Sequence, residues 1–417
     1  MDLQRCKGMR DWLPADMYKF RQIESAFRHS CLKWGYQEIR TPTLEYLYLF
    51  TAAGTLTPQM LSRVYSFLDW DGWSGERVVL RPDSTIPAAR LLLTGKQRQE
   101  LSRLFYVQSV FSFEETGKEA RERWQCGVEL MGSDEPAADV ELMLLGLDVL
   151  HALDFRGVEL KLSHLGLVRA LLDGFGLKTE QKTEILDRVL EGNGKALTDL
   201  KPPTPQIGRA LSLLVELKGD APGFLKNLQA ILSTSIPGAI PSLNNFIKIT
   251  EFLSFAGCPY QIDIAAGKGF EYYTGAVFQF CLGNEVIGAG GRYNELIPLL
   301  GGGNVPASGF ALYIEPLMAG LDVTPEGTEQ LILITSGAKD DWNSRFALAE
   351  ELRAAGYAAG VDLGSQTHFH WQVSIPASPG LPFILTDSRG TRRLQLNSVP
   401  EVLKALEEIG AGKISSA

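Results

Sequence analysis

The feature that most constrains the fold is a change of character in the middle of the chain. Segments that alternate short strand patterns with polar or glycine-bearing turns occur at 60–131 and again at 260–291. Between them, 165–254 is leucine-rich and helical in pattern, with proline-bearing joints. Because strand pattern resumes after this stretch, the sequence predicts an antiparallel sheet that is interrupted by a helical insertion and then completed.

A helix precedes the first strands. Its apolar residues recur at spacings of three and four along one face: Phe20, Ile23, Phe27, Cys31 and Trp34. This stripe predicts a helix over 14–35 that ends at Gly35. A short strand is expected at 36–41. It stops at Pro42, which cannot donate to a strand ladder and therefore belongs at an edge or at a strand end.

The same patterns divide the chain into regions. The interrupted sheet and its helices occupy 1–164 and 255–322, around the helical insertion at 165–254. A linker is expected at 323–328. Over 329–417 strands alternate with two helices, as they do in a small α/β domain. The predicted class of the whole chain is therefore α+β.

Composition limits the class of protein further. With 417 residues, 45% of them hydrophobic, and 40 Lys and Arg against 49 Asp and Glu, the chain is typical of an acidic globular protein of two or three domains. No apolar stretch approaches the roughly 18 residues of a membrane span, and no signal segment follows the N-terminal charges, so we expect a cytoplasmic protein. The acidic balance disfavours nucleic acid as a partner. The five cysteines form no C-x-x-C pair and are expected to be reduced thiols.

Several motifs are too weak to assign chemistry. The glycine clusters at 288–291 and 301–303 match neither a phosphate-binding loop nor a dinucleotide fingerprint, and tight turns explain them. His368 and His370 share one face of a possible strand but have no third ligand nearby, so no metal site is predicted. His164, which follows a strand, is expected to be an ordinary core or turn histidine.

Three polar segments are more informative. Gln125 and Glu129 lie four apart on a predicted strand and point to the same face, with Gly127 between them leaving a gap for a small ligand. A carboxylate beside an amide suits a ligand that carries N–H groups. The segment 81–85 offers a second carboxylate, and 268–273 offers a cation and two aromatic hydroxyls. Taken separately, the three segments equally fit a polar strand face, a helix cap and a hairpin.

Together these segments resemble the histidyl-tRNA synthetases, which are class II aminoacyl-tRNA synthetases, over nearly the whole chain. The similar motifs follow the family's order: G-M-R-D-W-L-P at 8–14, motif 1 at 35–45, L-R-P-D-S-T at 80–85, Q-x-G-x-E at 125–129, Y-Y-T-G after Lys268, and G-G-R-Y at 290–293 running into 309–315. The resemblance implies a six-stranded antiparallel sheet flanked by helices, an inserted helical domain, and a C-terminal α/β domain like an anticodon-binding domain. It also implies a homodimer through motif 1, with a two-fold interface.

Two departures from the synthetase pattern concern ATP. Motif 2 of a synthetase carries an arginine that holds the α-phosphate, and here Ser112 stands in its place. Motif 3 carries an arginine that lies on the adenine, and here that position is Pro316. Each such donor contributes on the order of 3 kcal/mol, so the loss of both would slow adenylate formation about 10⁴-fold. Lys268, in place of a third arginine, keeps the charge without the bidentate geometry.

The amino-acid pocket of the family, by contrast, is kept. The resemblance assigns these residues to a histidine site: Asp83, Thr85, Gln125, Glu129, Lys268, Tyr272 and Tyr273. A synthetase-like chain with this pocket but without both ATP arginines resembles the regulatory subunits of ATP phosphoribosyltransferase. That family implies a non-catalytic subunit without a cofactor, which joins the short-form catalytic subunit in a hetero-octamer and takes part in feedback inhibition of histidine biosynthesis by L-histidine. Residues 365–382 are poor in Lys and Arg, which fits lost contact with tRNA.

Two alternatives stay open. The first is an active histidine–tRNA ligase whose ATP contacts come from other positions, and histidine-driven exchange of pyrophosphate into ATP would identify it. The second is a different class II synthetase paralogue, either a stand-alone amino-acid-ligating enzyme or a pure binding protein.

Overall fold

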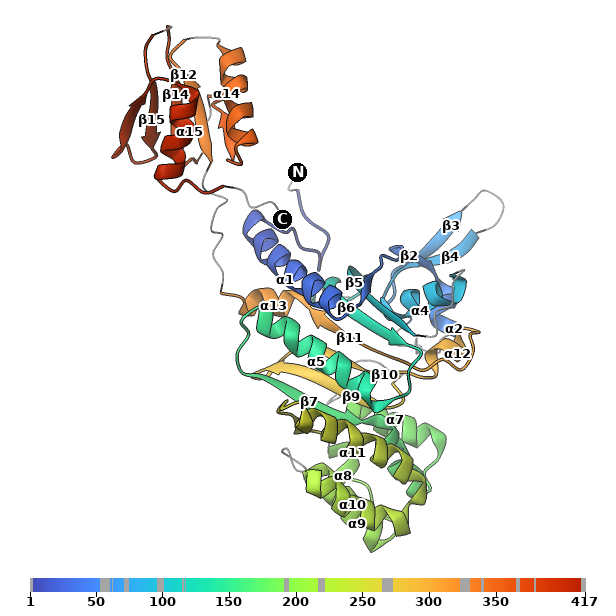
Figure 1. Cartoon of the computed structure of the whole chain (residues 1–417). Coiled ribbons are helices and arrows are strands. Elements are labelled where there is room, and N and C mark those ends of the chain that lie inside the picture. Colours follow the sequence, from blue (N-terminus) through green and yellow to red (C-terminus); the bar gives the residue numbers. More distant parts are fainter. Residues whose placement is uncertain are drawn as a thin grey trace. The chain divides into compact units, whose positions relative to one another are not determined.

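The chain divides into two compact units, Met1–Asp322 and Val323–Ala417, each of which is described here by itself (Figure 1). The computed structural model describes residues 3–52, 61, 63–70, 75–95, 101–114, 116, 118–190, 195–216, 222–264, 273–322, 331–338, 341–364, 368–378 and 380–413. The linker expected at 323–328 lies outside the described residues.

An eight-stranded sheet forms the centre of the first unit. In spatial order its strands are β1 (Gln37–Glu38), β5 (Ser102–Phe111), β6 (Glu122–Met131), β11 (Ala307–Tyr313), β10 (Glu285–Arg292), β9 (Ala276–Leu282), β7 (Val158–His164) and β8 (Gln261–Ile262). The six strands from β5 to β7 are antiparallel to one another, and β1 and β8 add parallel edges. The predicted antiparallel sheet is confirmed, with two short edge strands in addition.

One face of this sheet is covered by helices (Figure 1). They are α1 (Pro14–Lys33), α5 (Pro136–Ala152) and α13 (Ile314–Gly320). The predicted stripe of α1 is buried from Phe20 to Cys31, whereas Trp34 follows the helix and is only partly buried. Phe27 meets Phe105 of β5 edge to face at 5.8 Å. Helix α5 approaches the sheet closely at Gly146, where a Cβ atom would overlap the ring of Phe280. Because strand side chains alternate, the residues beside Phe105 and Phe280 point to the opposite face, which α1 and α5 leave open.

A smaller sheet lies beside the first strands. It consists of β2 (Leu44–Tyr46), β4 (Gly75–Leu80) and β3 (Ser66–Trp70), with the helices α2 (Leu47–Ala52) and α4 (Thr85–Thr94). The strand predicted at 36–41 is only two residues long. Strand ends of this kind depend on pairing partners that a local pattern does not contain.

The segment between β7 and β8 is helical. It contains α6 (Leu165–Gly174), α7 (Thr179–Leu190), α8 (Lys195–Thr198), α9 (Pro205–Glu216), α10 (Pro222–Ser235), the 3-10 turn η1 (Pro237–Ala239) and α11 (Ile240–Phe255). The leucine-rich pieces expected here correspond to α6, α7, α9 and α10. Their leucines form the interior of the cluster, and α11 joins it to the sheet by packing against both α10 and α5.

The second unit has a five-stranded sheet of its own. The strand order is β13 (Ala359–Val361), β12 (Ile332–Ser336), β14 (Trp371–Ile375), β15 (Phe383–Asp387) and β16 (Arg393–Leu396). The helices α14 (Trp342–Ala354) and α15 (Val399–Glu408) share one core with this sheet, around Ile334, Leu352 and Leu406. The alternation of strands and helices expected for a small α/β domain is present.

Four further expectations concern the cysteines, His164, metal binding and membrane spans. The cysteines are all unpaired thiols. His164 is a structural residue: its Nδ1 accepts the N–H of Leu167 at the start of α6, and burial lowers its pKa to about 4. Within the ranges given above, no group of histidines, cysteines and carboxylates is arranged to hold a metal ion, and no helix there is long and apolar enough to cross a bilayer.

Candidate functional site

The candidate site lies on the sheet face that α1 and α5 leave open. On β6, alternation places Arg123, Gln125, Gly127 and Glu129 on this face, as the sequence predicted for the last three. On the neighbouring strand β11, Gly309 stands opposite Glu129 and leaves space beside it. The face therefore combines polar side chains with positions that have no side chain.

Glu129 is the best-defined group of the site. Its carboxylate is 1% exposed and accepts hydrogen bonds from two tyrosines, the Tyr106 hydroxyl to Oε1 at 2.9 Å and the Tyr293 hydroxyl to Oε2. Burial raises the pKa of Glu129 to about 8, although hydrogen bonds from Tyr293, Thr85 and Tyr106 act in the opposite direction. None of the described residues forms an ion pair with Glu129.

Two glycines make this arrangement possible, and one of them corrects a prediction. At Gly309 a Cβ atom would overlap Glu129 Oε2 and would lie 2.7 Å from the Tyr293 hydroxyl. At Gly127 a Cβ atom would overlap the ring of Tyr106. The prediction that Gly127 opens a gap for a small ligand is wrong, because the Tyr106 ring fills that space.

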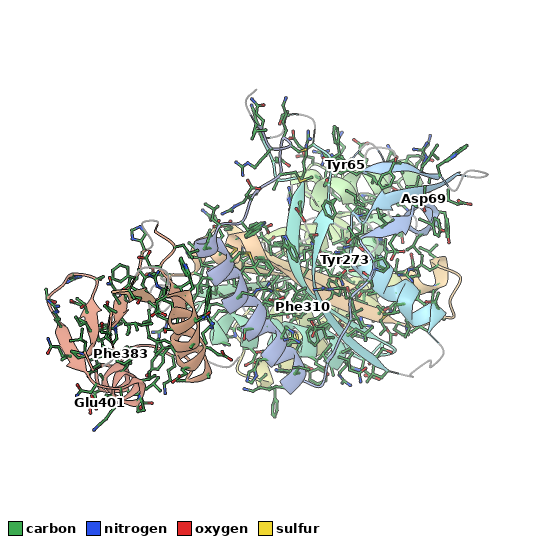
Figure 2. All side chains as sticks on the ribbon, turned by 90° about the horizontal axis from the view of Figure 1, so that it is seen from above. Tyr65, Asp69, Tyr273, Phe310, Phe383 and Glu401 are labelled. Atoms are coloured by element: carbon green, nitrogen blue, oxygen red, sulfur yellow. The ribbon has the colours of Figure 1, made fainter. Side chains whose placement is uncertain are left out.

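Asp83, Thr85 and Tyr273 are brought to the same place. Asp83 Oδ1 accepts the N–H of Ile86 at 2.9 Å and so helps to start α4, whose first residue is Thr85. The charge of Asp83 contributes to raising the pKa of Glu129 and of Tyr273. Tyr273 is buried in the first unit (Figure 2). Its ring centroid lies 6.4 Å from that of Tyr293.

The other predicted residues are placed less completely. Gln125 is half-buried and pairs in register with Gln108 of β5. Gln108 Oε1 accepts from Thr41 at 2.9 Å, while its buried Nε2 has no hydrogen-bond partner among the residues that the structure describes. Lys268 and Tyr272 lie outside the described residues, so their assignment to the site stays a prediction.

Three residues of the site were not predicted: Tyr106, Tyr293 and Gln108. Tyr293 belongs to the G-G-R-Y motif and directly follows β10. Tyr106 and Gln108 face Gly127 and Gln125 through the β5–β6 register. That register is a long-range property of the sheet, and no local pattern in the sequence reveals it.

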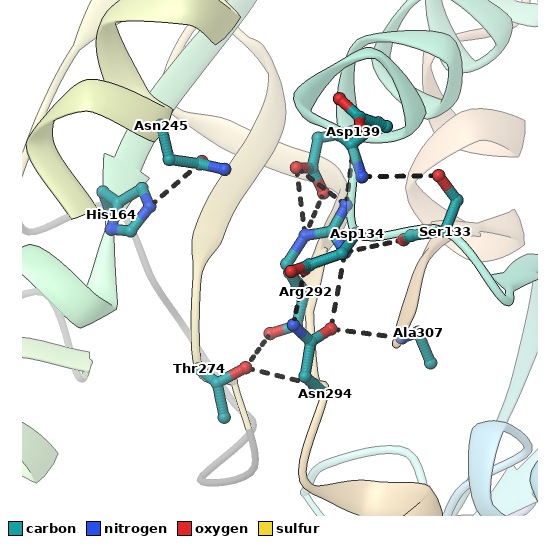
Figure 3. A network of polar contacts seen from close by, with 10 residues as sticks. Ser133, Asp134, Asp139, His164, Asn245, Thr274, Arg292, Asn294 and Ala307 are labelled. Atoms are coloured by element: carbon teal, nitrogen blue, oxygen red, sulfur yellow. Dashed lines mark hydrogen bonds and ion pairs between the residues drawn. The ribbon is translucent and has the colours of Figure 1, made fainter. Parts of the chain in front are cut away.

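A buried ion pair supports the strand end that carries Tyr293 (Figure 3). The guanidinium of Arg292 donates from Nε to both oxygens of Asp139 on α5 at 3.1 Å, and neither residue is more than 3% exposed. Burial raises the pKa of Asp139 to about 6, with Arg292 acting in the opposite direction. The Arg292 carbonyl accepts the N–H of Thr274, the residue after Tyr273. The Arg292–Asp139 pair therefore fixes the backbone next to both Tyr273 and Tyr293.

Ser112 and Pro316, which the resemblance to the synthetases assigned to lost ATP-binding arginines, have quite different surroundings. Ser112 follows β5 and borders a surface cavity of about 400 Å³. Pro316 is the third residue of α13, in the first helical turn, where a missing backbone N–H is tolerated. The adjacent Glu315 accepts the N–H of Trp124 at 3.0 Å, so this glutamate has a structural partner whether or not ATP binds.

Comparisons with family models, with protein sequences and with solved structures all find histidyl-tRNA synthetases or ATP phosphoribosyltransferase regulatory subunits. Residues 8–317 match the family described as histidyl-tRNA synthetase. A protein of Dehalococcoides mccartyi (strain CBDB1), named ATP phosphoribosyltransferase regulatory subunit, is 46% identical over 411 residues, which cover 97% of this chain and 98% of the relative. The histidine–tRNA ligase of Methanosarcina acetivorans is 33% identical over 344 residues, covering 81% of this chain and 80% of the ligase.

Solved structures agree with these sequence relatives. A crystal structure from Bacillus halodurans, described as an ATP phosphoribosyltransferase regulatory subunit/histidyl-tRNA synthetase, has a TM-score of 0.78 at 25% identity and covers 91% of this chain and 99% of its own. The histidyl-tRNA synthetase of Nostoc sp. PCC 7120, at 18% identity and a TM-score of 0.75, shares the fold over 98% of this chain and 100% of its own.

Proposed function

Because the chain belongs to the ATP phosphoribosyltransferase regulatory subunits, a family with the histidyl-tRNA synthetase fold, we propose that it activates a catalytic ATP phosphoribosyltransferase subunit and binds histidine for feedback control. Its role is regulatory, and the transfer reaction belongs to the catalytic subunit. The chain is far less similar to the histidine–tRNA ligases than to the regulatory subunits, at 33% against 46% identity.

Several finer points are part of the proposal. The catalytic partner is the short form of the enzyme, which lacks a regulatory region of its own, and the two kinds of subunit assemble as a hetero-octamer. The chain itself dimerises through the motif 1 region at 35–45. Its location is the cytoplasm, and the C-terminal unit is a remnant that no longer binds tRNA.

The observation that supports a histidine site most strongly is the buried carboxylate of Glu129. Tyr106 and Tyr293 hold both of its oxygens on one side of the sheet, and burial raises its pKa to about 8. A carboxylate in such surroundings is a strong acceptor for a ligand that brings its own N–H donor or positive charge. The imidazole of histidine carries that donor.

The remaining pocket residues suit the rest of a histidine molecule. Asp83 offers a carboxylate for the α-ammonium group, together with the amide of Gln125, and Tyr273 forms a wall along the ring. The unpaired Nε2 of Gln108 is a donor for a ligand oxygen on the same face. Lys268 is assigned to the ligand carboxylate from the sequence alone.

Adenylate formation does not fit the same site. Ser112 provides a hydroxyl where a guanidinium would neutralise the α-phosphate, and Pro316 provides neither a charge nor a donor. The two losses together correspond to about 10⁴-fold in rate. A pocket that binds the amino acid and does not activate it is a sensor.

Reconstitution tests this proposal. The full chain is mixed with the catalytic subunit encoded by the same genome, and phosphoribosyl transfer to ATP is followed with and without L-histidine. We expect the chain to raise the rate and histidine to lower it again. A catalytic subunit that is equally active alone would refute the activating role. Histidine-dependent pyrophosphate exchange by the chain alone would instead identify a histidine–tRNA ligase.

Inhibition can be assigned to one subunit in the same assay. If Glu129→Gln reduces the inhibition by histidine and leaves the activation intact, the sensor lies in this chain. Equal inhibition in both versions would place the histidine site on the catalytic subunit, leaving this chain an activator and scaffold.

A further inference from the structure

One buried amide nitrogen on the sheet face that carries Glu129 has no hydrogen-bond partner. Gln108, on β5, is 2% exposed, and its Nε2 donates to none of the residues that the structure describes. A buried donor without an acceptor is costly, and buried polar groups in folded proteins nearly always have a partner. This amide therefore calls for an acceptor that the described part of the chain does not supply.

The Gln108 amide is held in one orientation by Thr41, which directly precedes Pro42. The Thr41 hydroxyl is buried and donates to Gln108 Oε1 at 2.9 Å. Because this bond occupies the oxygen, the other end of the amide, Nε2, is directed away from Thr41. The donor is thus oriented before any ligand binds, which lowers the entropic cost of binding.

The strand register places this donor at the amino-acid end of the candidate pocket. Gln108 stands directly opposite Gln125 of β6, as Tyr106 stands opposite Gly127. Opposite residues of an antiparallel pair share one face, with Cβ atoms about 5 Å apart. Gln125 is only half-buried, so a ligand can reach this part of the face. Glu129 lies four residues further along β6, about 14 Å away, so a histidine whose ring meets Glu129 extends its other end toward both glutamines.

The acids of the pocket suit only two of the three polar groups of histidine. Glu129 and Asp83 are carboxylates, which attract the imidazole N–H and the α-ammonium group but repel the α-carboxylate. A donor without negative charge is needed at that third group, and the Gln108 amide is such a donor.

A buried positive charge lies behind the Gln108 amide. Arg81 is 5% exposed, and no described carboxylate lies within ion-pair distance of it. Its guanidinium donates to two neutral carbonyls, that of Ser109, the residue after Gln108, at 2.7 Å, and that of Thr41 at 2.9 Å. Glu45, whose charge reaches Arg81, is itself paired with Arg90 at 2.7 Å. Arg81 therefore favours an anion beside Gln108.

We propose that Gln108 determines the specificity of the pocket for a free α-carboxylate, with Nε2 donating to a carboxylate oxygen and the charge of Arg81 supporting it. This inference rests on the proposed histidine site and adds a residue that the resemblance to the synthetases did not assign to it. The imidazole stays at Glu129 and the ammonium group at Asp83. The ligand is then an intact α-amino acid, and an analogue that lacks the carboxylate is bound more weakly.

The test is calorimetric titration of the full chain with three probes: L-histidine, L-histidinol, whose carboxylate is replaced by a neutral hydroxymethyl group, and histamine, which has neither. We expect the wild type to bind L-histidine at least about 10-fold more tightly than the other two. Gln108→Leu keeps the approximate size without the donor. It should weaken L-histidine binding by about 10-fold and change the binding of the two analogues by less than about 2-fold.

Two further variants test the donor and its orientation. Gln108→Glu directs an acid at the ligand carboxylate, so it should weaken L-histidine binding more than Gln108→Leu does and should not weaken L-histidinol binding. Thr41→Val removes the hydroxyl that orients the amide, and it should reduce the preference for L-histidine over L-histidinol several-fold. The matched controls are Gln372→Leu and Thr335→Val, which break a Gln–Thr hydrogen bond of 3.2 Å in the second unit and should leave all three affinities unchanged.

The outcomes separate this inference from the pocket itself. Equal loss of all three ligands in Gln108→Leu would show a structural role, and an unchanged L-histidine affinity would show none, so either result overturns the inference while the pocket stands. Tighter L-histidine binding by Gln108→Glu would also overturn it, because the amide would then present its oxygen. A wild type that binds L-histidine at no concentration up to millimolar would refute the pocket and this inference together. If Gln108→Leu does not fold, the wild-type preference and Gln108→Glu still decide.

Discussion

Replacing Glu129 by glutamine tests the proposed histidine site at the carboxyl group on which histidine binding depends. The change replaces one carboxyl oxygen by an amide nitrogen and removes the ionisable group almost without changing the volume of the side chain. Both partners tolerate it, because the hydroxyls of Tyr106 and Tyr293 can accept as well as donate. Fold and self-association should therefore persist, and the effect should appear in ligand binding.

The size of the effect follows from the surroundings of the carboxylate. At 1% exposure, no water is at hand to replace a lost acceptor, so an imidazole N–H that met Glu129 would keep only a neutral amide oxygen or no partner. Loss of a charge-assisted hydrogen bond in such a place costs about 1–3 kcal/mol. Histidine affinity should fall by about 5- to 150-fold.

The same substitution should change the pH dependence of stability. Burial raises the pKa of Glu129 from 4.5 to about 8, so between these values the folded chain keeps a proton that the unfolded chain has released. The free energy of unfolding of the wild type should therefore fall as pH rises through this interval. Each pKa unit corresponds to about 1.4 kcal/mol, which gives a few kcal/mol at most. Glu129→Gln should lack this slope.

Calorimetric titration with L-histidine measures the affinity, and urea denaturation near pH 5 and near pH 8 measures the slope. The matched control is Glu141→Gln. Glu141 also accepts from a tyrosine hydroxyl, that of Tyr36 at 2.8 Å, but it lies on the opposite side of the sheet and pairs with Arg103. Equal histidine affinities of wild type and Glu129→Gln, or no binding to either below millimolar concentration, would refute the pocket.

Three further predictions concern other parts of the chain. The purified chain should show no histidine-dependent exchange of pyrophosphate into ATP, because Ser112 and Pro316 supply no phosphate-binding charge, and exchange at a hundredth of an ordinary synthetase rate or more, about 2.7 kcal/mol in barrier, would contradict this. Sedimentation should show a dimer at micromolar concentration, and a charge placed at Ile39, the residue after β1, should weaken it, whereas a monomeric wild type would rule the dimer out. Asp139→Asn should lower the free energy of unfolding in urea by about 3–5 kcal/mol, because it leaves the buried Arg292 with only the exposed carboxylate of Asp134 as a counter-charge, and a change below about 1 kcal/mol would show that the Asp139 pair is dispensable.

Local sequence patterns predicted much of the fold, because the residues that define a helix or a strand lie close together in the sequence. The stripe from Phe20 to Cys31 needs no partner to be recognised, and its helix runs from Pro14 to Lys33, close to the range expected. The ends of the strands were harder to predict. The pairing of Gln37 and Glu38 with β5 stops after two residues, and nothing within 36–41 encodes where its neighbour turns away.

The site was predicted in part for the same reason. Alternation on one strand placed Gln125 and Glu129 together, and this is what the structure has. The error at Gly127 came from beyond that strand: a missing side chain leaves space, but the sequence does not say which neighbour occupies it. Here Tyr106 does, by way of a register between residues that are 21 positions apart.

The interaction partners of the family's motif residues also distinguish residues with a structural role from residues with a functional one. Glu315 and Arg292 have partners within the protein, the Trp124 N–H and the Asp139 carboxylate, so the fold alone accounts for their presence. Glu129 is different. Its burial favours the protonated form, no described cation compensates its charge, and a residue without a carboxylate would avoid this penalty. Glu129 has hydrogen bonds from two tyrosines but no counter-charge, so a ligand that brings a positive charge or an N–H donor would offset this penalty, and the stability slope of Glu129→Gln measures how large the penalty is.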